Sequence, residues 1–307
     1  MTRHFLDLTD VGPEGIESIV RMAAQGPRPI LDGQSVAMVF EKPSARTRNS
    51  TEMAVVHAGG HAVMISDAEV GIDVRESAED VARTLGCYHQ IIAARVRNHA
   101  VFSRMASALD AQDNQVSIIN LLSDYSHPCQ AIADMLTLAD ECGGVDGLRG
   151  KHVVYVGDAN NVARSLAQAC LALGVSVTIC APPGYQFDDA TIAELEQFAR
   201  FDAAVARSDD PMTAVRGASA LYTDVWTSMG QEEEAQVRRK AFAQFSITEA
   251  LLANAADEAI VLHCLPAHRG EEISHEVLEG PRSRVWAQAK HRETAMYGVF
   301  GWIGEGV

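Results

Sequence analysis

Residues 151–180, KHVVYVGDANNVARSLAQACLALGVSVTIC, contain the pattern that decides the fold of this chain. They begin with an apolar run at His152–Val156, continue with a helix-like stretch at Asn161–Leu173 and end with a second run at Ser176–Cys180. Both runs are largely apolar rather than alternating, which is typical of parallel strands covered by helices on both faces. The segment therefore predicts a strand, a helix and a parallel strand, the unit of doubly wound α/β sheets.

The same alternation extends over the rest of the chain. We expect further strands at Ser35–Phe40, His61–Ile65, Ile91–Val96, Val116–Leu121, Ala220–Asp224 and Ile260–Cys264. Helical stretches fall between the strands, among them Arg48–Ala58, Ser77–Leu85 and Gln130–Ala139. An α/β protein with parallel sheets is predicted, and eight strands fit one large sheet, a barrel or two domains of four.

The chain has 307 residues, enough for about two domains of ordinary size. Its segment Glu141–Lys151, ECGGVDGLRGK, holds four glycines between a helical stretch and a new strand. This composition is typical of a connection, so we place a domain boundary near it. Because ligands of open α/β sheets bind beyond the carboxyl ends of strands, the functional residues are expected just after each strand.

Composition excludes several classes of protein. Apolar residues make up 47% and charged residues 21%, as in globular proteins, and the formal net charge is −16. Such a charge disfavours binding to nucleic acid or to anionic membranes, but permits a small anionic substrate where basic residues cluster. The six cysteines are scattered, the start MTRHFLDLTD lacks the apolar core of a signal peptide, and no apolar run approaches the ~20 residues of a membrane span. A cytoplasmic protein is predicted.

The first motif, FEKPSARTR at residues 40–48, follows a predicted strand and opens a helix. Lys42, Arg46 and Arg48 bring three cations close together, and Ser44 and Thr47 supply hydroxyl groups. Together with the N–H groups of a helix N-terminus, these residues could bind a phosphate or another oxyanion. The alternative is a solvated basic turn in which Ser44 only caps the helix.

The motif His127-Pro128-Cys129-Gln130 also lies between a strand and a helix. Its imidazole and amide could polarise a carbonyl, and Gln130 could accept a hydrogen bond from a substrate NH2 group. The alternative is a histidine that caps a loop beside a cysteine that packs.

Gly157-Asp158-Ala159-Asn160-Asn161 resembles a nucleotide-binding turn but keeps one of the three glycines of GxGxxG, so a dinucleotide site is weakly indicated. Asn160 and Asn161 could bind a polar ligand or cap the next helix. The segment Asp224–Gly230, DVWTSMG, carries a carboxylate, a hydroxyl and a glycine, which suit recognition of a ligand's amine and carboxylate groups. The alternative is a surface loop.

His263-Cys264-Leu265-Pro266 closes the last predicted strand, and His268 follows it. Three interpretations compete. His263, Cys264 and His268 could bind zinc, although no fourth ligand is evident. Cys264 could instead be a nucleophile paired with a histidine, or act without a covalent bond beside a turn that Pro266 shapes.

Taken together, FEKPSARTR, HPCQ, DVWTSMGQ and HCLPAHRGEE resemble, in this order, the ornithine carbamoyltransferases. The similarity runs over nearly the whole chain and includes GDANNVARS and an arginine near the C-terminus. SxRTR, HPxQ and HCLP mark the wider carbamoyltransferase family, and the SMG segment indicates its ornithine branch rather than its aspartate branch.

This resemblance implies two doubly wound α/β domains around a cleft and a homotrimer, or a multiple of trimers, with active sites at subunit boundaries. Residues 1–140, with a C-terminal helix at 290–307 that returns to them, would bind carbamoyl phosphate. Residues 141–289 would bind L-ornithine. Neither a metal nor another cofactor is implied, and nucleic acid and membrane are not expected as partners.

Matching motifs assign the site residue by residue. The resemblance implies carbamoyl phosphate binding by Ser44, Ala45, Arg46, Thr47, Arg95, His127, Gln130, Cys264, Leu265 and Arg292. It implies ornithine binding by Asn161, Asp224, Ser228 and Met229. Among these, the catalytic candidates are Arg95, His127, Cys264 and Arg292.

Three segments depart from the family's usual pattern. Ala45 replaces a hydroxyl residue, in a position that acts largely through its backbone N–H. In the loop Asp67–Arg75, Gly71 stands where many relatives send a glutamine to the neighbouring subunit. The segment 290–298, KHRETAMYG, also differs, although Arg292 stays in register.

The implied reaction transfers a carbamoyl group to the δ-amine of ornithine, giving citrulline and phosphate. The alternative is a carbamoyltransferase for another amine, putrescine or N-acetylornithine. A binding protein without activity and a nicotinamide dehydrogenase are the remaining candidates from other classes. The sequence leaves the physiological direction of the reaction open.

Overall fold

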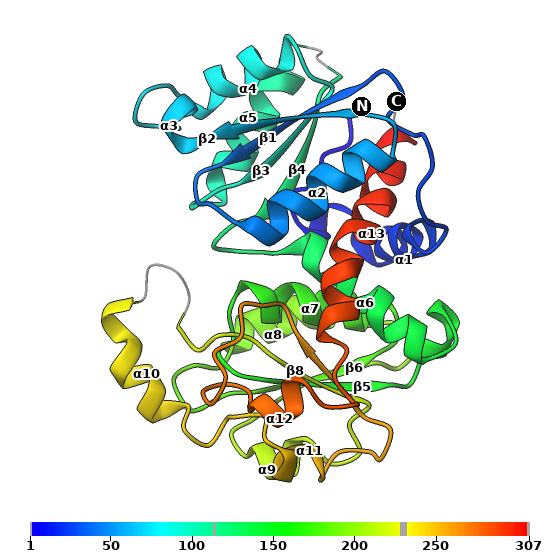
Figure 1. Cartoon of the computed structure of the whole chain (residues 1–307), viewed down its shortest axis with the longest axis vertical. Helices are drawn as coiled ribbons and strands as arrows, with labels where there is room; N and C mark the ends of the chain where they lie inside the picture. Colours follow the sequence, from blue (N-terminus) through cyan, green and yellow to red (C-terminus); the bar gives the residue numbers. More distant parts are fainter. Residues whose placement is uncertain (1, 113–114, 228–231, 306–307) are drawn as a thin grey trace. The chain divides into compact units, whose positions relative to one another are not determined.

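The structure is a computed structural model that describes residues 2–112, 115–227 and 232–305. The chain divides into two compact units, unit 1 (Met1–Ala133 with Lys290–Val307) and unit 2 (Asp134–Ala289). Both changes of unit fall inside a helix, α6 (Pro128–Glu141) or α13 (Val285–Gly304) (Figure 1). No helix among the described residues is long and apolar enough to cross a membrane.

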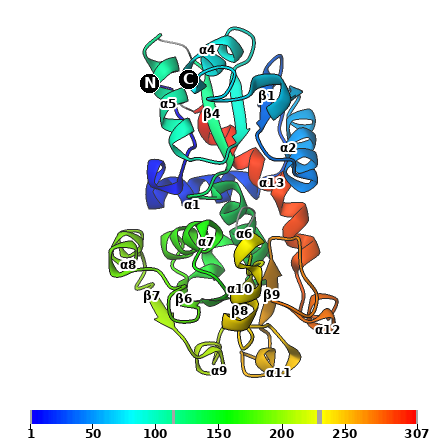
Figure 2. The same cartoon turned by 90° about the vertical axis from the view of Figure 1, so that its left-hand side faces the viewer.

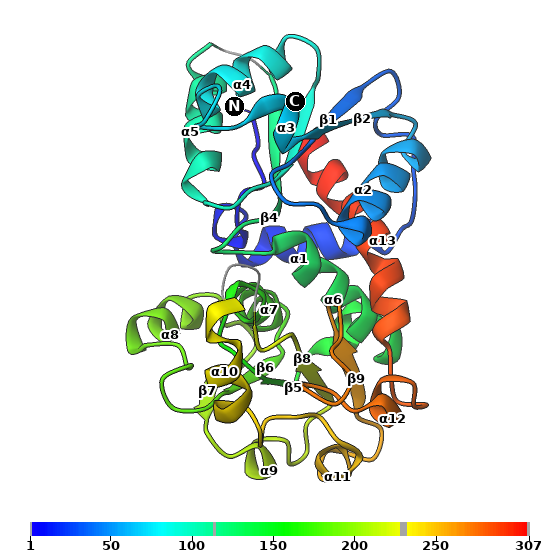
Figure 3. The same cartoon turned by 60° about the vertical axis from the view of Figure 1, so that its left-hand side comes forward.

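Unit 1 is built on a parallel sheet of four strands in the order β2-β1-β3-β4. The strands are β1 (Ser35–Phe40), β2 (His61–Ser66), β3 (Ile91–Arg95) and β4 (Ser117–Leu122). The helices before α6 are η1 (Leu8–Asp10), α1 (Gly12–Ala23), α2 (Ala45–His57), α3 (Asp67–Val70), α4 (Ala78–Gly86) and α5 (Ala100–Asp110). Figure 3 shows α4 and α5 on one side of this sheet and α2 on the other.

Alternation along the buried strands assigns their side chains to the two faces of this sheet. On β3, Ile92 and Ala94 point into the apolar core under α4 and α5, where Phe102 and Met105 pack. Arg95, one residue further along, therefore points to the opposite face, the one covered by α2. Its burial at 7% exposure places a charged group at the end of a core strand.

Unit 2 contains a parallel sheet of five strands in the order β7-β6-β5-β8-β9. The strands are β5 (His152–Val156), β6 (Ser176–Cys180), β7 (Val205–Ser208), β8 (Ala220–Thr223) and β9 (Ile260–His263). The helices are η2 (Val145–Leu148), α7 (Asn161–Ala172), α8 (Asp189–Glu196), α9 (Pro211–Ala214), η3 (Glu232–Glu234), α10 (Ala235–Ala241), α11 (Glu249–Leu252) and α12 (His275–Leu278).

Helices cover both faces of the second sheet (Figure 2). On one face Tyr155 and Tyr222 stack with their ring centroids 5.6 Å apart. On the other, Val154 and Leu221 join an apolar cluster with side chains of the segments around α11 and α12. Burial on both faces explains why the strands lack alternating polar residues.

The prediction of two parallel α/β sheets is confirmed, and the eight expected strands are present with ends shifted by at most one residue. One strand was missed. β7 lies at the edge of its sheet, where Ala206 and Arg207 are exposed. A strand that is half-solvated has no continuous apolar run by which to find it.

The C-terminal residues Lys290–Val307 belong to unit 1, together with Met1–Ala133. Within α13, Gly298 lies against α1 so closely that a Cβ atom there would overlap the carbonyl oxygen of Ile19 and lie 2.8 Å from the Cβ of Ala23. The absence of a side chain at Gly298 is what allows the two helix backbones to approach.

We expect Gly298→Ala to lower the free energy of unfolding by about 1–3 kcal/mol, because the added methyl group overpacks the contact between α13 and α1. Helix propensity alone would instead predict that Gly298→Ala raises the free energy of unfolding, because alanine favours a helix more than glycine does. Urea unfolding measures the difference. Gly304→Ala, in the same helix with no atom within 4 Å of the added Cβ, is the control. Equal stability of Gly298→Ala and wild type would contradict the close approach.

Candidate active site

The polar motifs of unit 1 all follow the carboxyl ends of its parallel strands. FEKPSARTR begins at the end of β1, Arg95 ends β3, and HPCQ follows β4. Carboxyl ends of parallel strands lie at one edge of a sheet, so residues far apart in sequence meet there. These residues form what we call the basic site.

The N-terminus of α2 contributes backbone and hydroxyl groups to the basic site. Ser44 is the N-cap, and its Oγ accepts a hydrogen bond from the backbone N–H of Thr47 at 3.3 Å and donates one to Thr47 Oγ1 at 3.1 Å. Ala45 and Arg46 occupy the first two helical positions, where backbone N–H groups have no partner within a helix. Ser44 therefore does cap the helix, and a positive helix end remains beside it.

A buried network joins three motifs around Arg292 of α13. Its Nη1 donates to Gln130 Oε1 at 2.6 Å and lies 3.5 Å from His127 Nε2. Its Nη2 donates to Thr47 Oγ1 at 3.4 Å. All four side chains are buried. The motif HPCQ is thus held by a residue from the far end of the chain.

Positive charge accumulates in the basic site. Arg95 is buried, and burial together with the charges of Arg292 and Arg46 lowers its pKa to about 10. Among the described residues, neither Arg95 nor Arg46 forms an ion pair, and Arg95 Nε is buried without a hydrogen-bond partner. Cations that repel one another in a partly dry site favour an anionic ligand.

His127 is neutral at physiological pH. Burial, with the charges of Arg292 and Arg95 adding to it, holds the pKa of this imidazole well below its ordinary value. A neutral imidazole can donate one hydrogen bond and accept another. Cys129 beside it is a packed thiol: burial raises its pKa to about 12, and its Sγ donates to the carbonyl of Asn120.

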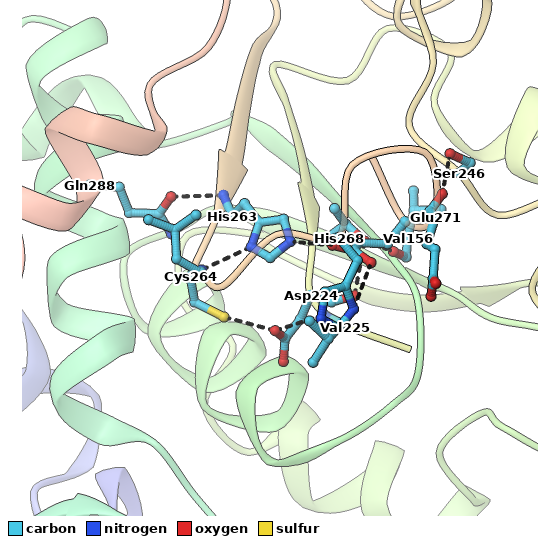
Figure 4. Close-up of polar contacts among 12 residues, drawn as sticks. Val156, Asp224, Val225, Ser246, His263, Cys264, His268, Glu271 and Gln288 are labelled. Carbon is cyan, nitrogen blue, oxygen red and sulfur yellow. Dashed lines mark hydrogen bonds and ion pairs between the residues drawn. The ribbon is translucent and has the colours of Figure 1, made fainter. Parts of the chain in front are cut away.

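The motifs of unit 2 also follow strands, at the carboxyl edge of the second sheet. Asp224 comes after β8 and is buried. Its Oδ1 accepts from the thiol of Cys264 at 3.0 Å, and its Oδ2 accepts from Asn160 Nδ2 at 3.1 Å. Figure 4 shows the thiol of Cys264 directed at the Asp224 carboxylate. We call Asp224, Cys264 and Asn160 the thiol–carboxylate site.

The backbone that presents Cys264 is fixed by a buried imidazole (Figure 4). His263 Nδ1 accepts from the backbone N–H of Leu265 at 2.8 Å, while Nε2 contacts Glu272 Oε1 at 3.0 Å. Leu265 has a φ of 60° and is followed by a cis bond to Pro266. Both ring nitrogens of His263 are thus engaged. The ligand atoms of His263 and Cys264 group with Asp224, whereas His268 groups with Glu271 and Glu272, so the three residues of the zinc interpretation do not form one group among the described residues.

The structure distributes the predicted site residues over both units. Eight lie together in the basic site: Ser44, Ala45, Arg46, Thr47, Arg95, His127, Gln130 and Arg292. Cys264 and Leu265, which the resemblance groups with carbamoyl phosphate, belong to unit 2 together with Asn161 and Asp224. Ser228 and Met229 lie outside the described residues.

Sequence reasoning missed several residues that support the site. It left the role of Asn160 open, and the structure shows that its Oδ1 accepts from the N–H groups of Val162 and Ala163 while its amide holds Asp224. It also missed Glu272 and the buried ion pair between Asp158 and Arg238. Glu272 lies nine residues beyond the end of β9, and a carboxylate at that distance gives no signal in the sequence of its partner His263.

Fold and geometry define a protein of two α/β units, the first of which gathers buried arginines at one edge of its sheet. Two family models match the chain: the carbamoyl-P binding domain of aspartate/ornithine carbamoyltransferase at residues 3–140, and the Asp/Orn binding domain at residues 149–303. An ornithine carbamoyltransferase of Acidothermus cellulolyticus is 46% identical over 299 residues, 95% of this chain and 93% of that protein. The chain belongs to the aspartate/ornithine carbamoyltransferase family.

Solved structures agree with this assignment. The ornithine carbamoyltransferase from Pyrococcus furiosus superposes with a TM-score of 0.92 at 40% identity, covering 100% of this chain and 98% of that chain. A relative from the same organism, 40% identical over 99% of this chain and 97% of its own length, is named "Ornithine carbamoyltransferase, anabolic". An acetylornithine transcarbamylase complexed with acetylcitrulline superposes with a TM-score of 0.83 at 26% identity, covering 97% of this chain and 98% of that chain.

The depressed pKa of His127 predicts an acid-dependent loss of stability. Below about pH 6.5 the unfolded chain takes up a proton on this imidazole, whereas the folded chain does not. Stability is therefore full above that pH and falls as the pH drops, by up to about 1.4 kcal/mol per pH unit. We expect His127→Gln to remove this pH-dependent contribution to stability. Unfolding free energies measured between pH 7 and pH 5 test the expectation.

His275→Gln, the same exchange at an exposed position, is the control for the substitution itself. An identical slope in wild type and His127→Gln would mean that the buried imidazole is not held neutral.

Proposed function

We propose that this protein is an ornithine carbamoyltransferase. It transfers the carbamoyl group of carbamoyl phosphate to the δ-amine of L-ornithine, and the products are L-citrulline and phosphate. The observation that carries the proposal is the basic site, in which Arg95 and Arg46 have no carboxylate partner among the described residues. The family and the names of its similar relatives support the choice of ornithine.

Carbamoyl phosphate would bind in unit 1, with residues 1–140 and 290–307 forming its domain. The N-terminus of α2, with Ser44, Ala45, Arg46 and Thr47, holds the phosphate, because backbone N–H groups and the helix dipole favour an anion there. Arg292 reaches the same ligand from α13. Gln130 and the neutral His127 contact the carbamoyl group through hydrogen bonds.

The chemistry requires charge stabilisation at two places. The amine nitrogen attacks the carbamoyl carbon, a C–N bond forms, and the carbonyl oxygen becomes an oxyanion. Arg95, His127 and Thr47 donate hydrogen bonds to this oxygen, and each such donor is typically worth about 10²–10³ in rate. The C–O bond to phosphate then breaks, cations stabilise the departing dianion, and the amine's extra proton passes to the phosphate.

Ornithine would bind in unit 2, the domain of residues 141–289. The δ-amine must be neutral to attack, although an amine of this kind has an ordinary pKa of about 10.4. Asp224 and Cys264 orient it, Leu265 lies beside them, and Asn161, Ser228 and Met229 bind the amino-acid end. Cys264 acts without a covalent bond, because direct transfer needs no acyl-enzyme and its thiol already donates to Asp224.

The proposal extends to the assembly and the setting of the enzyme. We propose a cytoplasmic homotrimer, or a multiple of trimers, that works in arginine biosynthesis, like the relative named as anabolic. In the loop that reaches a neighbouring subunit in many relatives, Gly71 adopts a left-handed conformation with a φ of 52° and ends α3. A side chain such as glutamine would be strained at this φ. Another residue must therefore supply any contact that relatives make there.

Product formation from carbamoyl phosphate tests the function directly, with ornithine, putrescine, N-acetylornithine and aspartate offered in parallel. Citrulline from ornithine, and no product from the other amines, is the expected result. Turnover with N-acetylornithine or putrescine would keep the carbamoyl phosphate site and overturn the choice of amine. Absence of turnover with all four would favour a binding protein.

We expect Cys264→Ser to slow citrulline formation only partly, by about tenfold to a hundredfold, because a hydroxyl group can still donate to Asp224. Steady-state kinetics with saturating carbamoyl phosphate measure the effect. Cys87→Ser, at an exposed position, should leave the rate unchanged. Complete loss of activity together with a carbamoyl group trapped on Cys264 in the wild type would show covalent catalysis instead.

A further inference from the structure

Arg292 and Glu293 are consecutive residues of α13, and their side chains bind different parts of α2. Arg292 Nη2 donates to Thr47 Oγ1, in the first turn of α2. Glu293 Oε1 lies 2.7 Å from Nδ1 of His57, the last residue of α2. Side chains of adjacent helical residues diverge by about 100°, so this pair attaches one helix to both ends of another.

A tyrosine completes the contact at the second end. Tyr297, one turn after Glu293 in α13, donates from its hydroxyl to the same Oε1 atom at 2.5 Å, and this hydroxyl lies 3.4 Å from His57 Nδ1. Burial raises the pKa of Glu293, but hydrogen bonds from Tyr297 and His57 outweigh it and hold the pKa below its ordinary value. Glu293 is therefore an ionised acceptor for both donors.

These contacts lie in the segment KHRETAMYG, where the chain departs from the family's usual pattern. Glu293 and Tyr297 belong to that segment, and Arg292 is the residue in it that stays in register. The contact between Gly298 and Ile19 joins α13 to α1, whereas Arg292 and Glu293 join α13 to α2. On the side toward α2, within unit 1, Glu293 is the acidic side chain that α13 offers to α2 among the described residues.

We propose that Glu293, held by His57 and Tyr297, is a positioning residue that sets the place of the Arg292 guanidinium in the basic site. The proposal rests on the proposed function, because Arg292 matters there as a ligand of carbamoyl phosphate. Glu293 itself touches no substrate. Without Glu293, α13 shifts along α2, and the Arg292 guanidinium then makes weaker hydrogen bonds to Thr47 and to the phosphate.

Binding of inorganic phosphate to the full-length protein tests the proposal without the amine substrate. We expect Glu293→Gln and His57→Asn each to weaken phosphate binding about two- to fivefold, the range of a partly exposed ion pair. The double variant should bind phosphate no more weakly than either single variant, because the two substitutions remove the same contact. In kinetics, KM for carbamoyl phosphate should rise by the same factor, while kcat and KM for the amine stay unchanged.

Asp110→Asn is the matched control. It removes another contact between histidine and carboxylate in unit 1, that of His4 Nε2 with Asp110 Oδ1 at 3.3 Å, which involves neither α2 nor α13. Phosphate binding should not change. Tyr297→Phe, which keeps the pair of Glu293 and His57, should have an effect smaller than that of Glu293→Gln.

A folded Glu293→Gln variant with unchanged phosphate affinity would overturn the inference, whatever its thermal midpoint, and would leave the proposed function intact. Independent effects of Glu293→Gln and His57→Asn, multiplying in the double variant, would also overturn it. A wild-type protein that neither binds phosphate nor consumes carbamoyl phosphate would instead overturn the proposed function itself.

Discussion

The guanidinium of Arg292 holds the basic site together. It bonds Gln130 from one motif and Thr47 from another, and it lies beside His127. Its charge also lowers the pKa values of His127 and Arg95. Unit 1 thus holds cations close together at a partly dry sheet edge, an arrangement that carries an energetic cost until an anion binds. An anionic ligand would offset that cost, whereas a neutral ligand would not.

The parallel sheets explain why such a site exists at all. In unit 1, β1, β3 and β4 all end at one edge, so motifs that are about 50 and 30 residues apart converge there without long loops. Unit 2 repeats the arrangement with β5, β8 and β9, but its carboxyl edge carries a carboxylate and a thiol in place of arginines. One architecture thereby presents a cationic edge in unit 1 and an edge with a carboxylate and a thiol in unit 2, and the difference lies in a few residues after each strand.

Sequence reasoning found the strands because their apolar runs reflect burial on both faces, as in β1 and β5. It missed β7, whose edge position exposes Ala206 and Arg207. The residues of the candidate site also divide into those that the sequence reveals and those that it does not. Ser44, Thr47, His127 and Asp224 lie within about seven residues after the end of a strand and could be found by position. The partners Glu272 of His263 and Asn160 of Asp224 could not, since a hydrogen bond across a fold leaves no mark in the spacing of residues.

The sequence by itself determined the alternation of strands and helices, except for the edge strand β7, together with the family and its motifs. Hydrophobic period and local motif are properties of neighbouring residues. Only the tertiary structure decided which charges share a space. It buried Arg95 and Arg292 together, made the imidazole of His127 neutral, placed Cys264 against Asp224, and joined Glu293 to His57 across 236 positions. The strength of the interaction between charges depends on their distance and their burial, and the folded chain sets both.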